Sequence, residues 1–182
     1  KIEIQFRSNA MDQIAAQHIK NNPNLTLIGL RYFNVYGSRE FYKGSTASMV
    51  IQLGHQILSG NAPRLFNNSE NIMRDFVFIE DVIQANINAS LSKKSGTYNI
   101  GSGIARSFQE IADILQKELK TDFITNYFPN PYSGYQSNTQ ADISPAKANL
   151  GYNPSFSLEE GIKKYTPEII RLHELEALWI TF

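Results

Sequence analysis

Residues 30–40 constrain the fold of this chain most, because an apolar run passes there directly into a polar loop marked by a glycine. Residues 25–32 are mostly apolar without strict alternation, which is typical of a strand covered on both faces. In an open parallel α/β sheet, ligands bind just beyond the carboxyl ends of the strands. Residues 34–43 are therefore expected at the binding edge of a sheet.

Apolar residues at helical spacing alternate along the chain with short strand-like runs, and no linker is long enough to separate two domains. Ser45 and Thr46 are suited to cap the second helix, and Ser107 to cap the fourth. This alternation indicates an α/β layered fold. The predicted helices cover residues 11–21, 49–58, 81–91, 108–119, 144–150 and the stretch after 157, and the predicted strands cover 25–32, 63–66, 76–79, 96–101 and 123–128.

A glycine-rich phosphate loop of the Gly-x-Gly-x-x-Gly type is not found after any predicted strand. The nearest pattern is Gly101-Ser102-Gly103, which follows a strand but leads to the next helix too late for a loop of that type. We interpret it as a tight turn. The sequence therefore shows no evident means of holding the pyrophosphate of a dinucleotide.

The amino-acid composition argues against several kinds of binding partner and site. Among 182 residues, 17 basic and 17 acidic side chains cancel, so no overall field favours nucleic acid or an anionic membrane. No apolar run approaches the roughly 20 residues that span a bilayer. Cysteine is absent, which excludes disulfides and thiolate metal sites and fits a cytoplasmic protein. The three histidines share no spacing typical of ligands, so no metal site is expected.

Residues 1–10 look foreign to the fold. The tripeptide Ser-Asn-Ala at positions 8–10, directly before Met11, is typical of what a protease-cleavable purification tag leaves behind, and the preceding residues are interpreted as vector sequence. The alternative is a native amphipathic strand over residues 1–6. We expect the native fold to begin at Met11.

Three motifs follow one another at residues 39–45, 63–77 and 134–142. The first reads Arg-Glu-Phe-Tyr-Lys-Gly-Ser, the second contains Pro-Arg-Leu-Phe and Arg-Asp-Phe-Val, and the third begins Gly-Tyr-Gln. Over residues 11–165 the chain resembles the NAD-dependent epimerase/dehydratase family, the extended branch of the short-chain dehydrogenase/reductases. Within that family it is most similar to the ADP-L-glycero-D-manno-heptose 6-epimerases.

The resemblance implies the C-terminal part of a Rossmann-type enzyme. Residues 11–45 would end its nucleotide-binding domain, and residues 46–182 would form mostly the small substrate-binding lobe, with elements that return to the nucleotide-binding sheet. The implied reaction inverts C6 of an ADP-linked heptose: NADP, or NAD, accepts a hydride from the carbon and returns it to the other face. Such chemistry needs an acid/base group on each side of that carbon.

The resemblance assigns one of these acid/base roles, and a cofactor contact, to Lys43. A lysine can take such a role when it is desolvated or lies near another cation, here Arg39. Val35 would lie against the nicotinamide through its backbone. These two residues, Val35 and Lys43, are the implied cofactor contacts.

Arg74 is the candidate for the diphosphate, because a planar guanidinium matches phosphate oxygens with paired hydrogen bonds. The alternative is an ion pair of Arg74 with Asp75 or Glu70. Tyr135 would close the sugar-diphosphate pocket with its hydroxyl. The implied substrate-binding residues are Asn34, Ser45, Gln52, Phe66, Asn67, Asn68, Ser69, Arg74 and Tyr135.

The chain also departs from the family pattern. Tyr42 and Gln52 stand where the family has histidine, and an acidic residue and a glycine usually occupy positions 67–68. The family's Tyr-x-x-x-Lys pair would fall just before Met11, and neither Ile4 with Ser8 nor Gln5 with Asn9 can supply that chemistry. We therefore expect a retained substrate pocket, no cofactor bound by this chain alone, and no epimerase turnover.

Two alternatives remain open at this point. One is a 4-epimerase or 4,6-dehydratase that acts on another nucleotide sugar, although those enzymes usually lack the Lys-Gly-Ser arrangement of residues 43–45. The other is a non-catalytic nucleotide-sugar-binding module. In either case we expect a homo-oligomer, because the strand at residues 25–32 would leave an uncovered edge that invites pairing.

Overall fold

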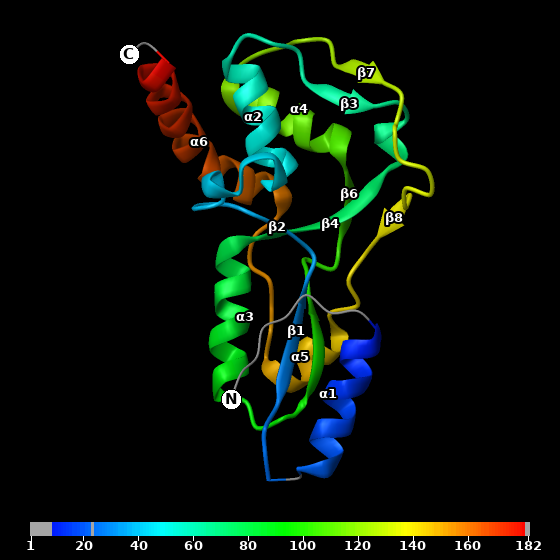
Figure 1. Ribbon diagram of the computed structural model, residues 1–182. Coiled ribbons are helices and arrows are strands. Elements are labelled where there is room, and N and C mark those ends of the chain that lie inside the picture. The colour runs from blue at the N-terminus through cyan, green and yellow to red at the C-terminus, as the bar shows by residue number, and fades with distance from the viewer. Residues whose placement is uncertain (1–8, 23, 181–182) are drawn as a thin grey trace.

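The computed structural model describes residues 9–22 and 24–180, and its elements gather in two halves joined by extended strands (Figure 1). Of the tag-like residues 1–10, positions 1–8 lie outside the described part, and Asn9 and Ala10 are the first residues of α1. In chain order the elements are α1 (Asn9–Asn21), β1 (Ile28–Tyr32), β2 (Asn34–Tyr36), η1 (Phe41–Thr46), α2 (Met49–Leu58), β3 (Arg64–Phe66), η2 (Ser69–Asn71), β4 (Met73–Phe78), α3 (Ile79–Leu91), β5 (Gly96–Ile100), β6 (Ala105–Ser107), α4 (Phe108–Leu119), β7 (Asn126–Phe128), β8 (Asn138–Thr139), α5 (Ser144–Leu150) and α6 (Leu158–Ile180).

The first half is built on the parallel pair β1–β5, with Ile28 opposite Gly96 and Tyr32 opposite Ile100. Ile28 and Ile100 are fully buried in a cluster that includes side chains of α3 and α5. Burial of this kind explains why the sequence of β1 shows no alternation of apolar and polar residues. The predicted α/β class is confirmed.

The two halves are connected through β4, which pairs in parallel with β2 and β8 and antiparallel with β6. The chain leaves the first sheet at Phe33, whose N–H donates to the carbonyl of Ile100 at 3.0 Å. Asn34 then opens β2 opposite Phe76. The prediction that a loop begins at residue 34 is therefore wrong for residues 34–36, because pairing with β4 forms a second short strand there.

The second half packs α2, α4 and α6 around one apolar cluster that includes Leu53, Leu115 and Ile162. Ser107 and Glu110 form the capping box of α4, which confirms the predicted cap. Ser48 occupies the N-cap position of α2. The predicted caps Ser45 and Thr46 are wrong, because both residues lie in η1.

Arg106 of β6 forms ion pairs with Glu110 of α4 and with Glu159 at the start of α6, so it links the two helices. The Arg106 guanidinium lies 2.6 Å from a carboxylate oxygen of Glu159 and 2.7 Å from one of Glu110. This hydrogen bond from Arg106 lowers the pKa of Glu159. Within the described ranges, no helix is both long and apolar enough to cross a bilayer.

The turn at residues 101–103 wraps around an internal anion. The backbone N–H groups of Ser102 and Gly103 donate to the Asp75 carboxylate at 2.6 and 2.9 Å, and a Cβ on Gly101 would lie 2.7 Å from it. The tight turn predicted for this glycine pattern is confirmed. Its N–H groups are occupied by the protein's own carboxylate, so they are not free to hold a phosphate.

Candidate functional site

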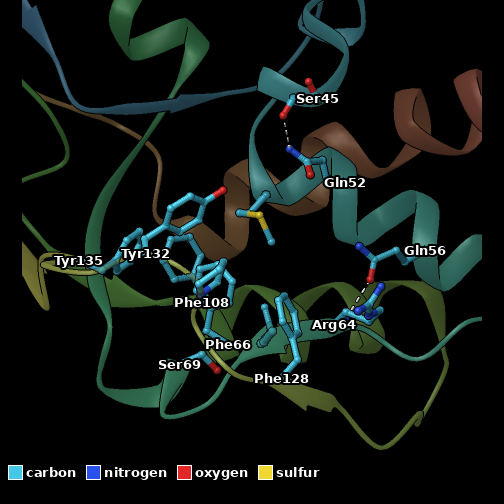
Figure 2. Close-up of a pocket in the computed structure, with 13 residues that line it drawn as sticks. Ser45, Gln52, Gln56, Arg64, Phe66, Ser69, Phe108, Phe128, Tyr132 and Tyr135 are labelled. Atoms are coloured by element: carbon cyan, nitrogen blue, oxygen red, sulfur yellow. Dashed lines mark hydrogen bonds between the residues drawn. The ribbon is translucent and has the colours of Figure 1, made fainter.

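A cavity of about 530 Å³ lies between α2 and the β3–β7 pair, on the side of the loop that follows β7 (Figure 2). Its floor is a row of rings in which Phe66 lies 5.0 Å from Phe128 and 5.8 Å from Tyr135, measured between centroids, in edge-to-face geometry. The lining residues are Ser45, Met49, Gln52, Gln56, Arg64, Leu65, Phe66, Ser69, Phe108, Phe128, Pro131, Tyr132 and Tyr135.

The upper wall of the cavity is polar. Gln52 donates from Nε2 to the carbonyl of Ala47 at 2.6 Å and to that of Ser45 at 3.3 Å. These bonds fix the side-chain amide, and its oxygen remains as an acceptor. The first turn of α2 and the end of η1 thus present oriented polar groups above the rings.

Ser69 contributes a buried hydroxyl to the lining. Its residue is 1% exposed, and its Oγ has no hydrogen-bond partner among the described residues. Asn68 precedes it in a left-handed conformation with φ of 60°, which turns the chain tightly from β3 into η2. Buried polar atoms in folded proteins normally have partners, so this hydroxyl is an exception next to the cavity.

Arg74 lies behind the ring of Tyr135. Its guanidinium donates to the carbonyls of Met73 at 2.8 Å and Gln136 at 2.6 Å, and its Cζ lies 4.8 Å from the Tyr135 ring centroid and 5.9 Å from that of Phe108. In the part of the chain that the structure describes, Arg74 forms no ion pair, so the alternative of a pair with Asp75 or Glu70 is not what is found.

The structure brings most of the predicted substrate residues to one cavity. Ser45, Gln52, Phe66, Ser69 and Tyr135 line it, and Arg74 adjoins it through Tyr135. The remaining candidates stand outside the lining. Asn34 donates from Nδ2 to the carbonyl of Asp75 at 3.0 Å, one residue from Arg74 along β4. Asn67 and Asn68 are exposed in the turn after β3.

The two cofactor candidates also lie outside the cavity lining. Val35 is half-buried against the cluster around β1 and β5. Lys43 is exposed in η1, where its carbonyl accepts a hydrogen bond from Thr46 Oγ1 at 2.8 Å. Because η1 also carries Ser45, Lys43 belongs to the segment that forms the upper rim of the cavity.

Sequence reasoning missed eight lining residues. They come from α2, β3, α4, β7 and the loop that follows β7. The local signals for some of them were the Pro-Arg-Leu-Phe motif at 63–66 and the clustered prolines and tyrosines at 129–135. They are Met49, Gln56, Arg64, Leu65, Phe108, Phe128, Pro131 and Tyr132.

The fold also brings two distant histidines together. The Nδ1 atoms of His55 on α2 and His173 on α6 lie 3.4 Å apart, a contact that their sequence positions did not suggest. Among the described residues there is no group of three or more histidine, cysteine, aspartate or glutamate side chains placed to hold a metal ion.

Comparison with known proteins identifies the family. A model of the NAD dependent epimerase/dehydratase family matches residues 8–101 of the chain. The chain belongs to this family. A solved member, the ADP-L-glycero-D-manno-heptose-6-epimerase of Helicobacter pylori, is 47% identical, with a TM-score of 0.80 over 88% of the chain.

Two further solved epimerases share the fold. UDP-glucose 4-epimerase of Thermotoga maritima, solved with UDP-glucose, is 30% identical with a TM-score of 0.77 and covers 88% of the chain. UDP-glucuronic acid 4-epimerase of Bacillus cereus, solved with UDP-glucuronic acid and NAD, is 28% identical with a TM-score of 0.74 over 88% of the chain. The chain spans about half of each, namely 48% of the Helicobacter pylori chain and 50% of the other two.

Proposed function

We propose that this chain carries the substrate-binding part of an NADP-dependent epimerase that inverts C6 of ADP-glycero-manno-heptose. The observation that carries the proposal is the single cavity in which polar groups of η1 and α2 face an aromatic floor. The 47% identity to a heptose epimerase supports this sugar over those of the UDP-linked relatives.

The proposed substrate contacts follow the chemistry of the walls. Ser45 and Gln52 would bind sugar hydroxyls, because both sit on the polar upper wall. Arg74 would bind the diphosphate. A guanidinium has five N–H donors, and the bonds to Met73 and Gln136 leave others for phosphate oxygens. Tyr135, which lies between Arg74 and the cavity, would close over the bound group.

The proposed chemistry takes place at the rim. Lys43 would serve as one acid/base group, Asn34 would contact the sugar, and Val35 would lie against the nicotinamide. The cofactor itself supplies reversible hydride transfer. We expect this chain to bind the ADP-sugar in the cavity. We also propose a homo-oligomer in the cytoplasm.

A thermal-shift series with ADP-, UDP- and GDP-linked sugars tests the proposal. An ADP-sugar at about 100 times its Kd should raise Tm by roughly 5–10 °C, since that saturation stabilises the folded state by about 2.7 kcal/mol. UDP- and GDP-sugars should give smaller shifts. Equal shifts with UDP-sugars would favour a 4-epimerase instead, and no shift with any of the three would overturn the proposal.

Ser69→Ala provides the matched variant for this series. The hydroxyl has no partner in the protein, so its removal should leave the Tm of the free protein unchanged or slightly raised. Because Ser69 lines the cavity and is a proposed substrate contact, the shift caused by the ADP-sugar should fall clearly. A variant that loses stability but keeps the full ligand shift would show that the hydroxyl serves the fold and not the ligand.

A further inference from the structure

Arg64 is the one charged residue among the 13 that line the cavity, and none of them is acidic. It opens β3, the strand that carries the aromatic floor. The ion pairs found among the described residues involve Arg106 and Lys164, not Arg64. The positive charge of Arg64 is therefore not neutralised by a carboxylate in this part of the structure.

The backbone and side chain of Arg64 are each held in place. The backbone N–H donates to Oε1 of Gln56 at 2.9 Å, and Cζ lies 5.0 Å from the ring centroid of Phe128 (Figure 2). No described hydrogen bond uses a nitrogen of the guanidinium, so its N–H donors remain available. Because Gln56 accepts through its oxygen, its amide nitrogen also remains as a donor.

Arg64 and Arg74 lie at different ends of the cavity. Arg74 lies behind Tyr135, and in Figure 2 Tyr135 and Arg64 stand at opposite ends of the row of rings. The polar upper wall with Ser45 and Gln52 is a third region. If the diphosphate lies at Arg74 and the sugar at the upper wall, the end at Arg64 is left for the nucleoside.

We propose that Arg64 binds the nucleobase of the substrate, which stacks on the outer face of a guanidinium that itself lies over the ring of Phe128. This inference rests on the proposed function. A planar guanidinium stacks on aromatic faces and donates hydrogen bonds from its edge, which an ammonium group does not reproduce. With Arg64 on the face of the base, the free amide donor of Gln56 suits an acceptor atom on the edge of the base.

The surface beyond Arg64 has room for that edge. A second hollow of about 440 Å³ shares Gln56 and Arg64 with the cavity and is otherwise lined by Asn61, Ala62 and Asn126. It contains no ring and no carboxylate. A base stacked on the guanidinium of Arg64 would thus meet a planar cation on its face and amide groups at its edge.

Calorimetric titration of ADP-glucose into the wild type, Arg64→Ala and Arg64→Lys tests the inference, with Arg171→Ala on the exposed face of α6 as the control. If Arg64 stacks on the base, both Arg64 variants should bind about tenfold more weakly, because lysine keeps the charge but not the plane. The Tm of the free proteins and the affinity of the control should match the wild type.

The other outcomes separate the inference from the proposed function. If Arg64→Lys binds within twofold of the wild type while Arg64→Ala is weakened, the residue acts as a charge toward phosphate and the inference is overturned. If both variants bind like the wild type, the inference also fails, and the proposed function stands. If the wild type binds no ADP-sugar, both fail together.

Discussion

Asp75→Asn is expected to lower the free energy of unfolding by about 3–4 kcal/mol, which is a large share of the stability of an ordinary domain. The Asp75 side chain is fully buried and accepts hydrogen bonds from Ser102 N–H at 2.6 Å, Ser102 Oγ at 2.7 Å, Gly103 N–H at 2.9 Å and Ala141 N–H at 3.0 Å. An asparagine would place an NH₂ group where one of these oxygens accepts. At least one buried donor would then face another donor.

The same substitution should disturb the candidate site, because Asp75 lies between Arg74 and Phe76 on β4 and its carbonyl accepts from Asn34. Urea denaturation, monitored by circular dichroism, measures the decrease in the free energy of unfolding. Asp122→Asn, at an exposed position before β7, is the control and should stay within about 0.5 kcal/mol of the wild type. A loss for Asp75→Asn no larger than that of the control would show that the carboxylate does not hold these segments together.

Gly161→Ala is expected to destabilise the protein by about 2–3 kcal/mol, although alanine is the better helix former. Gly161 lies in α6 against the buried phenol of Tyr36. An ideal Cβ at Gly161 would overlap the Tyr36 hydroxyl oxygen and lie 2.9 Å from its Cζ. The ring has little freedom to move away, because it is 1% exposed and packs against Phe78 with centroids 5.5 Å apart.

A double-mutant cycle with Tyr36→Phe isolates this overlap. Removing the hydroxyl takes away the nearest atom, so the double variant should recover part of the stability that Gly161→Ala loses. Lys163→Ala, exposed on the same helix, should be nearly neutral. Additive effects in the cycle would mean that the cost at position 161 does not come from Tyr36.

The local signals in the sequence were enough for the helices but not for the shortest strands. The helices α2, α4 and α5 match their predicted spans, because each combines apolar periodicity with its own start or stop residues. The strands β2, β6 and β8 have only two or three residues each and were missed. Each exists because it pairs with β4, and that pairing is decided by tertiary structure.

The candidate site shows the same contrast between residues that local motifs indicated and residues that only the tertiary structure brings together. Ser45, Gln52, Phe66, Ser69 and Tyr135 could be named from motifs and lie together in the structure. Met49, Phe108 and Phe128 could not, because they come from three separate elements, α2, α4 and β7, that meet only in the folded structure. The spacing of these residues along the chain does not predict that they lie together.

The central claim, that these separate segments form one ADP-sugar cavity, is tested most directly by amide NMR of the 20.6 kDa chain during titration with ADP-glycero-manno-heptose. We predict that shift changes concentrate together at residues 45–52, 64–69 and 128–136, with weaker changes along β1 and β5. Saturable changes confined to one of these segments, or centred on β1 and β5, would contradict a shared cavity.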